Sequence, residues 1–228
     1  MWYEYLLAGL FFIGGYFFGS FSTGYFFGMK HGHDIRSEGS GNIGTTNALR
    51  TMGKSAGLIT FLGDLAKAFI PTLLVRLVYC KQMGYGPDLT YVITLITGLG
   101  VFVGHIFPFY LHFKGGKGVA VSAAVIIATA ADGGIGVWMI FGGIVLFIIV
   151  VAITRYVSLG SLVVMWYLPI YSVIRFRDSG FFWLTMGLGC FFTALIYIKH
   201  AGNIRRLLNG TERKLFEKQE TEKAEETK

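Results

Sequence analysis

Long apolar runs without charge constrain the fold of this chain more than any other feature. The run from Tyr5 to Met29 contains no charged side chain, and similar runs recur as far as residue 198. About twenty apolar residues match the length that a helix needs to cross roughly 30 Å of hydrocarbon. Such a helix satisfies all of its backbone N–H and C=O groups internally. We therefore expect an all-α, polytopic integral membrane helix bundle.

The charge content supports this class. Only 14% of the residues are charged and 54% are hydrophobic, whereas soluble domains devote roughly a quarter of their residues to charge. The formal net charge of +7 suits an anionic lipid surface or an anionic substrate. No nucleic-acid-binding motif is present. We expect membrane lipid as a partner and no nucleic acid.

The apolar runs predict seven transmembrane helices, at about 5–29, 56–79, 89–111, 119–131, 135–153, 157–174 and 180–198. The fourth is short for an average bilayer, and it crosses only where the membrane thins or the helix is partly buried in protein. Fusing it with the fifth would give six spans.

The distribution of charge favours seven spans over six. Seven spans place fifteen of the twenty Lys and Arg residues on one side and four on the other. Lys and Arg accumulate on the cytoplasmic side, so the N-terminus is predicted outside and the C-terminus in the cytoplasm. Residues 1–211 form a single transmembrane domain in this interpretation. Residues 212–228 form a charged tail, predicted to be disordered because it has little apolar content.

Three polar segments share the predicted cytoplasmic face, at residues 34–50, 105–118 and 199–212. Each combines glycine with cations, and glycine lets successive backbone N–H groups point at an anion. In the first segment short hydrogen-bonding side chains precede Arg50, which can clamp two oxygens. An ordinary solvated turn would have a similar composition, but three such segments on one face favour an anion site.

The second and third segments each have an ordinary alternative. Residues 114–118, Lys-Gly-Gly-Lys-Gly, precede a span and have the form of an anion-binding loop. They are not a Walker A loop, because Lys117 is followed by Gly118; an interfacial lysine beside a helix start is the alternative. The third segment could be a basic membrane anchor. A membrane anchor would not explain the presence of His200, Asn203 and Glu212.

Histidines and one Asp–Lys pair are two further groups of polar residues. The five histidines have no Cys or carboxylate at metal-ligand spacing, so no metal site is expected. Asp64 and Lys67 are three residues apart inside the second predicted span, where each charge alone would be costly. Mutual neutralisation is the expected role, and a contribution to the polar site is the alternative.

The three segments closely resemble the motifs of the bacterial membrane acyl-phosphate:glycerol-3-phosphate acyltransferase family. The motifs are GSGNIGTTNALR at 39–50, GHIFP at 104–108 with FKGGKG at 113–118, and HAGNIRRL at 200–207 with NGTE at 209–212. Their order and spacing match the family from the first span to Glu212. The resemblance implies transfer of a fatty acyl group from acyl-phosphate to the 1-hydroxyl of glycerol 3-phosphate, giving lysophosphatidic acid and phosphate.

The resemblance also implies site residues. The expected catalytic residues are Ser40, Arg50, Lys114, His200 and Asn203. The expected substrate- and phosphate-binding residues are Asn42, Gly44, Thr45, Thr46, Asn47, His105, Gly115, Gly116, Lys117, Gly118, Arg205 and Glu212. No cofactor is implied. The enzyme would be a multi-pass protein of the bacterial plasma membrane with its site facing the cytoplasm, and it would receive its donor from a soluble acyl-phosphate-forming enzyme.

The chemistry of an activated donor fits these residues. The enzyme has to position an alcohol, stabilise developing charge and remove one proton. Either His200 or the substrate phosphate, with a second pKa near 6, could accept that proton. The His and Asp five positions apart that acyl-CoA-dependent acyltransferases share are absent. A small anion transporter or channel is the alternative function, and a lipid-binding scaffold is a weaker one.

Overall fold

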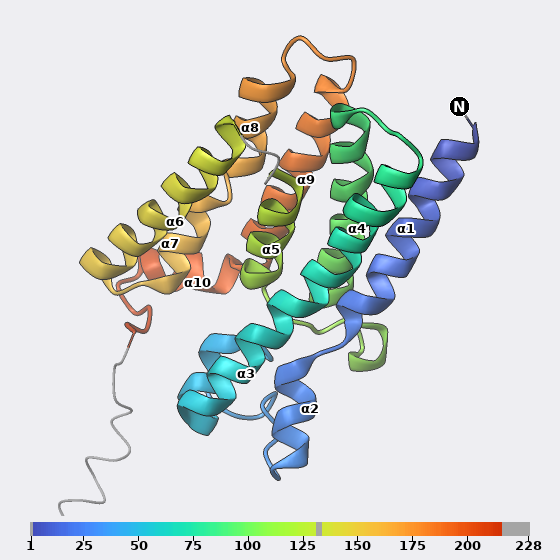
Figure 1. Cartoon of the computed structure of the whole chain (residues 1–228). Coiled ribbons are helices and arrows are strands. Elements are labelled where there is room, and N and C mark those ends of the chain that lie inside the picture. The colour runs from blue at the N-terminus through green and yellow to red at the C-terminus, as the bar shows by residue number, and fades with distance from the viewer. Residues whose placement is uncertain (1, 131–133, 216–228) are drawn as a thin grey trace, which may run out of the picture.

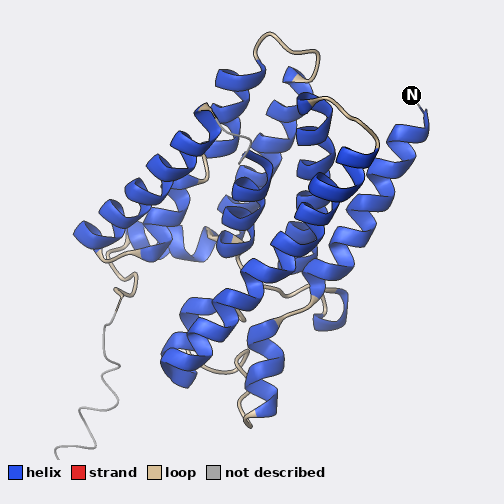
Figure 2. Cartoon of the chain, in the orientation of Figure 1, coloured by secondary structure: helices blue, strands red, loops and turns tan. Residues whose placement is uncertain are grey.

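Helices make up the regular structure of this computed structural model, which describes residues 2–130 and 134–215. No strand occurs among those residues, as Figure 2 shows. In chain order the elements are α1 (Trp2–Ser20), α2 (Thr23–Lys30), α3 (Thr45–Leu73), the π-helical turn η1 (Leu74–Cys80), α4 (Pro87–Ile106), the 3₁₀ turn η2 (Phe109–Leu111), α5 (Val119–Ala130), α6 (Ile135–Thr154), α7 (Val157–Val164), α8 (Tyr167–Phe176), α9 (Phe182–Lys199) and α10 (Ala201–Leu208).

Six helical segments among the described residues are long and apolar enough to cross a membrane. They are Leu6–Lys30, Thr45–Cys80, Pro87–Leu111, Ile135–Thr154, Val157–Phe176 and Phe182–Lys199. The all-α membrane fold is therefore confirmed. The predicted fourth span is the shorter helix α5, so the count of seven spans stays a prediction, as does the orientation of the two termini. The start of α1 and helix α10 lie at opposite ends of the bundle (Figure 1).

Helix α1 packs against α4 through glycines spaced four residues apart on both helices. Gly15 and Gly19 of α1 lie against the backbone of Thr97 and Val101. In return, Gly100 and Gly104 of α4 lie against the backbone of α1. A side chain at any of these positions would collide with backbone atoms, and small residues at this spacing let membrane helices approach closely. Helix α4 becomes the buried centre of the bundle as a result.

The first predicted span, 5–29, corresponds to the candidate span Leu6–Lys30, and within it the helix is interrupted between α1 and α2. The interruption is stable because distant side chains bind its backbone. Tyr110 Oη accepts a hydrogen bond from Ser22 N at 3.0 Å and donates one to Ser20 O at 2.9 Å. Lys67 Nζ donates to Phe21 O at 2.8 Å. Every backbone group that leaves a helix inside a membrane protein needs such a partner.

Helix α3 begins at Thr45, well before the span predicted to start at residue 56. The second half of the first polar segment is therefore helical rather than a turn. Gly53 interrupts the helix with φ 85° and ψ −175°, a backbone conformation that favours glycine. The short first part of α3 is thus set at an angle to its membrane part.

Helix α5 is short and is largely buried in protein. A short fourth span was expected to cross the membrane only where the bilayer thins or where the helix is partly buried in this way. Most of its residues are buried, including Val121 and Val125. Its last turn ends inside the protein, where Arg76 of η1 donates hydrogen bonds from Nη1 to the carbonyls of Ala128 and Thr129. Those carbonyls would otherwise lack partners, as the last carbonyls of any helix do.

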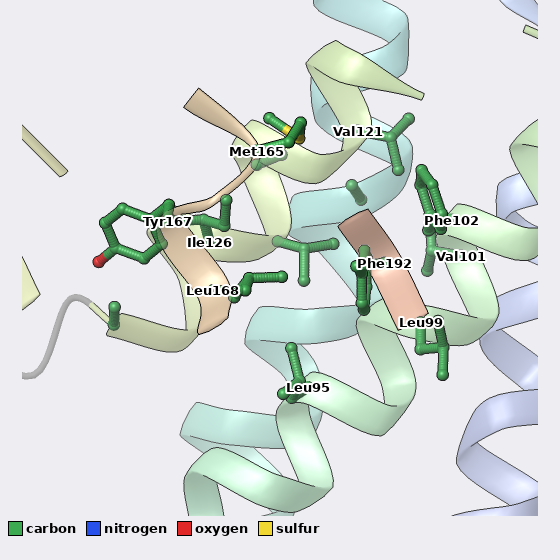
Figure 3. Close-up of a cluster of buried hydrophobic side chains, with 14 of the residues drawn as sticks. Leu95, Leu99, Val101, Phe102, Val121, Ile126, Met165, Tyr167, Leu168 and Phe192 are labelled. Atoms are coloured by element: carbon green, nitrogen blue, oxygen red, sulfur yellow. The ribbon is translucent and has the colours of Figure 1, made fainter. Parts of the chain in front are cut away.

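The core lies where α4, α5, α8 and α9 meet. Figure 3 shows its side chains, with Phe102 of α4 and Phe192 of α9 in contact and Tyr167 at the edge of the cluster. The Phe102 and Phe192 rings stack with centroids 4.8 Å apart. This cluster fixes α5 against α4, and so it fixes the loop that precedes α5.

Replacing Arg76 with Met tests its role at the end of α5. We expect the free energy of unfolding to fall by roughly 1–3 kcal/mol, because two buried carbonyls lose their partner. Unfolding of the purified protein in mixed micelles measures the change. The matched control is Arg177→Met, since the Arg177 side chain is 73% exposed. Equal effects of the two substitutions would contradict the account.

Candidate active site

One cavity of about 970 Å³ lies among α3, α5, α6, α7 and α10, with a polar end and an apolar part. The starts of α3 and α5, the end of α6 and α10 lie at the same end of the bundle (Figure 1). All three polar segments contribute to the lining, as the sequence predicted. The predicted residues that line it are Ser40, Asn42, Gly44, Thr45, Thr46, Asn47, Arg50, His105, Lys117, Gly118, His200, Asn203 and Glu212.

The first segment is shaped by the buried amide of Asn47. Its Oδ1 accepts a hydrogen bond from Ser40 N at 2.8 Å. Its Nδ2 donates to the carbonyls of Ile35 at 3.1 Å and Glu38 at 3.0 Å. A side chain at Gly39, where φ is 60°, would collide with this amide. Asn47 therefore holds the loop in place, and it also lines the cavity.

The start of α3 faces the cavity with groups suited to an anion. Its N-cap is Gly44, which supplies no side-chain hydrogen bond to the first turn. Thr45 Oγ1 is buried and has no hydrogen-bond partner within the described residues. Arg50, one turn further along α3, also lines the cavity. A helix N-terminus with a nearby guanidinium is a favourable site for a phosphate.

In the second segment, Lys117 lines the cavity and Lys114 does not. Burial lowers the pKa of Lys117 to about 8; Glu212 opposes this shift, and Arg206 and Arg50 add to it. Lys114 is exposed. Lys117 thus stays largely protonated at neutral pH and contributes a cation to a partly dehydrated site.

The glycines of the second segment serve the loop rather than the cavity. Gly115 N donates to Ile106 O at 3.2 Å, and Gly116 N donates to His105 O at 3.1 Å. A side chain at Gly116 would collide with the His105 ring. The expectation that these two N–H groups bind an anion is corrected, because the carbonyls at the end of α4 already accept them. Neither glycine lines the cavity.

In the third segment, His200 is a neutral side chain. Its Nδ1 donates to Ile196 O at 2.9 Å, which leaves the lone pair on Nε2. Burial lowers the pKa of His200 to about 4, despite the opposing effect of the Ile196 carbonyl. The imidazole is therefore a weak proton acceptor near neutral pH.

Glu212 ties the end of the described chain to the cavity. It accepts hydrogen bonds from Ser158 Oγ at 2.7 Å, Asn203 Nδ2 at 2.5 Å and Arg206 Nε at 2.7 Å. Burial raises its pKa, but these bonds outweigh burial and the pKa is lowered. Glu212, where the predicted tail begins, thus makes side-chain contacts with α7 and α10. The disorder predicted for the tail falls mainly on residues 216–228, which lie outside the described residues.

A buried ionic network supports the cavity from the side of the membrane helices. Lys67 Nζ lies 2.8 Å from Asp64 Oδ1 and 2.8 Å from His105 Nδ1. The expected neutralisation of Asp64 by Lys67 is confirmed. The ammonium can only donate, so His105 Nδ1 accepts, and its ring proton is on Nε2. Asp64 and His105 both line the cavity, so the pair also contributes to the polar site.

Some residues that line the cavity were not predicted from the sequence, and one predicted residue of the third segment, Arg205, lies outside the lining. Arg206 lines the cavity, whereas Arg205 is exposed and does not. Helical phase could have found this, because 200, 203 and 206 fall on one face of a helix. Ser158, Lys199 and Arg213 are further polar residues of the lining that were not predicted. No group of three or more potential metal ligands occurs among the described residues.

Replacing Asn47 with Ala tests the support of the first segment. One buried carbonyl, one partly buried carbonyl and one N–H group lose their partner, so we expect the free energy of unfolding to fall by roughly 1–3 kcal/mol. Proteolysis should also become faster within residues 35–50. Asn209→Ala is the control, because Asn209 is exposed at the end of α10. A stable Asn47→Ala protein with unchanged proteolysis would argue against the supporting role.

Comparisons with known proteins agree with the resemblance drawn from the three motifs. Residues 9–210 match the family model described as Glycerol-3-phosphate acyltransferase. The glycerol-3-phosphate acyltransferase of Trichlorobacter lovleyi is 38% identical over 210 residues, covering 92% of this chain and 98% of that protein. The glycerol-3-phosphate acyltransferase of Clostridioides difficile strain 630 is 39% identical over 210 residues, covering 90% of this chain and 94% of that protein.

Two solved structures are similar over nearly the whole chain. Both are of PlsY (YgiH), an integral membrane glycerol 3-phosphate acyltransferase. Its glycerol 3-phosphate form has a TM-score of 0.76 and 31% identity, covering 91% of this chain and 95% of that one. Its lysophosphatidic acid form has a TM-score of 0.74 and 30% identity, with the same coverage. This chain therefore belongs to the glycerol-3-phosphate acyltransferase family of integral membrane enzymes.

Proposed function

We propose that the protein transfers a fatty acyl group from acyl-phosphate to the 1-hydroxyl of sn-glycerol 3-phosphate, giving lysophosphatidic acid and phosphate. The observation that carries the proposal is a single cavity with a cationic polar end and a long apolar part. Both substrates have a phosphate, and only the donor has a long hydrocarbon chain. A cavity of this composition can bind the two phosphates close together while the chain lies among apolar side chains.

The cations of the polar end bind the phosphates in this proposal. Arg50, Lys117 and Arg206 come from the three polar segments and all line the cavity. Guanidinium groups bind phosphate oxygens in pairs, and a lysine adds a point charge. Lys114 and Arg205, which the sequence favoured, are exposed and outside the lining, so they are not assigned to substrate. Ser40, Asn203 and His200 remain close to the reacting groups as parts of the lining.

The reaction needs one nucleophilic attack and one proton transfer. The 1-hydroxyl oxygen of glycerol 3-phosphate attacks the acyl carbon, the bond from that carbon to the phosphate oxygen breaks, and inorganic phosphate leaves. We assign the proton to a phosphate group rather than to His200. The pKa of His200 is about 4, whereas the second pKa of a phosphate monoester is about 6. The phosphate is thus the stronger base.

The membrane orientation belongs to the same proposal. The polar end of the cavity contains cationic side chains from all three segments, and Lys and Arg accumulate on the cytoplasmic side. We place it at the cytoplasmic face of a bacterial plasma membrane, where a soluble enzyme can supply the acyl-phosphate. Phe61 and Ile144 line the apolar part and are 39% and 48% exposed. The apolar part therefore opens toward the lipid, which gives a chain in the bilayer a way in.

Turnover of synthetic acyl-phosphate tests the function directly. Purified protein should release phosphate and form lysophosphatidic acid only when glycerol 3-phosphate is also present. Replacing Lys117 or Arg206 with Ala should lower kcat/KM by about a hundredfold or more, because a cation that lines the cavity is lost from the phosphate site. Arg205→Ala should stay within about threefold. Folded wild-type protein without turnover would contradict the proposal, and anion uptake into proteoliposomes would then be the next assay.

The pH dependence of kcat/KM follows from Lys117. The cation is present below its pKa of about 8 and is lost above it, so kcat/KM should fall as the pH rises past that value. On the acid side, kcat/KM should fall below about pH 6, where glycerol 3-phosphate becomes a monoanion. Lys117→Arg should remove the alkaline fall, because a guanidinium does not titrate in this range. An acid fall near pH 4 alone would instead identify His200 as the base.

A further inference from the structure

We propose that Gly143 of α6 sets the longest acyl chain that the cavity accepts, an inference that rests on the proposed function. Gly143 lines the apolar part of the cavity. A Cβ atom placed there would meet a single atom within 4 Å, Cδ2 of Tyr167, at 3.9 Å. The space that a side chain would fill at this position is therefore part of the cavity.

The depth of Gly143 matches the end of a membrane-length acyl chain. The polar end of the cavity lies at the start of α7, just after the end of α6, where Ser158 binds Glu212. Gly143 is eleven residues before the last residue of α6, Thr154, which places it about 16 Å along the helix axis. One leaflet of hydrocarbon is about 15 Å thick, half of the bilayer core. A chain anchored at the phosphates therefore reaches Gly143 near its terminal methyl.

Tyr167 makes the wall beside Gly143 rigid at this level. Its Oη donates to Gly136 O at 3.3 Å, and its ring stacks on Tyr171 with centroids 5.7 Å apart. Figure 3 shows Tyr167 at the edge of the buried cluster, with Ile126 and Met165 nearby. Because this ring is held on two sides, it does not move aside for a side chain at position 143. A larger residue there takes space from the chain.

A matched control is the neighbouring glycine. Gly142 lies on the same helix but is exposed, is not part of the cavity lining, and has no atom within 4 Å of an added Cβ. Substitutions at Gly142 and Gly143 change helix propensity equally. Only those at Gly143 change the volume available to the chain.

The experiment compares palmitoyl phosphate and decanoyl phosphate as donors, in the same bilayer, for wild type, Gly143→Ala, Gly143→Leu and Gly142→Leu. The measured quantity is the ratio of kcat/KM for the long donor to that for the short donor, relative to wild type. Partition of each donor into the bilayer is the same for all four proteins, so it cancels. Each buried methylene contributes roughly a factor of four to binding.

We expect Gly143→Leu to lower the ratio by at least about tenfold and Gly143→Ala by about two- to fourfold. Gly142→Leu should leave the ratio unchanged. An unchanged ratio in both Gly143 variants, or an equal fall in Gly142→Leu, would overturn the inference and leave the proposed function standing. If Gly143→Leu does not fold, Gly143→Ala decides, since its Cβ has room. Wild type that uses neither donor would instead overturn the proposed function.

Discussion

The buried ammonium of Lys67 is the interaction on which the rest of the structure depends. A charge inside an apolar bundle is stable only with close partners, and Lys67 has three of them, each at 2.8 Å: Asp64, His105 and the carbonyl of Phe21. One side chain thus joins α3, α4 and the interruption between α1 and α2. Asp64 and His105 also line the cavity, so the same contacts that satisfy the buried charge position the polar end of the site.

The cavity has a polar end and an apolar part for the same reason: polar groups in a membrane protein need hydrogen-bond or ionic partners within the protein. The polar segments lie where helices begin and end, so uncompensated N–H groups and cations gather at one end of the bundle. Deeper in the cavity, α5 and α6 contribute apolar side chains such as Ile127 and Ile140, and Arg76 binds the last carbonyls of α5. A substrate with a phosphate and a hydrocarbon chain matches that division, and Gly143 marks how far the chain extends.

Much of the fold could be predicted from the sequence because apolar runs and cation positions are local signals. The interruption near Phe21 could not, since the groups that stabilise it, Lys67 and Tyr110, are distant in sequence. Within the site, motifs identified the right segments but not which member of each pair of cations faces the cavity. Arg206 rather than Arg205 does so because 200, 203 and 206 share one face of α10, a spacing that is informative only if the segment is taken to be helical.

In the proposed function, the three segments together bind one phosphate-bearing substrate. A double-mutant cycle of glycerol 3-phosphate binding to Arg50→Ala, Arg206→Ala and the double variant measures this directly by calorimetry. The two residues come from the first and third segments, 156 positions apart. If both face one site, the losses in binding free energy should be non-additive by about 1 kcal/mol or more. Additive losses, or a loss from only one of the two substitutions, would contradict a shared site.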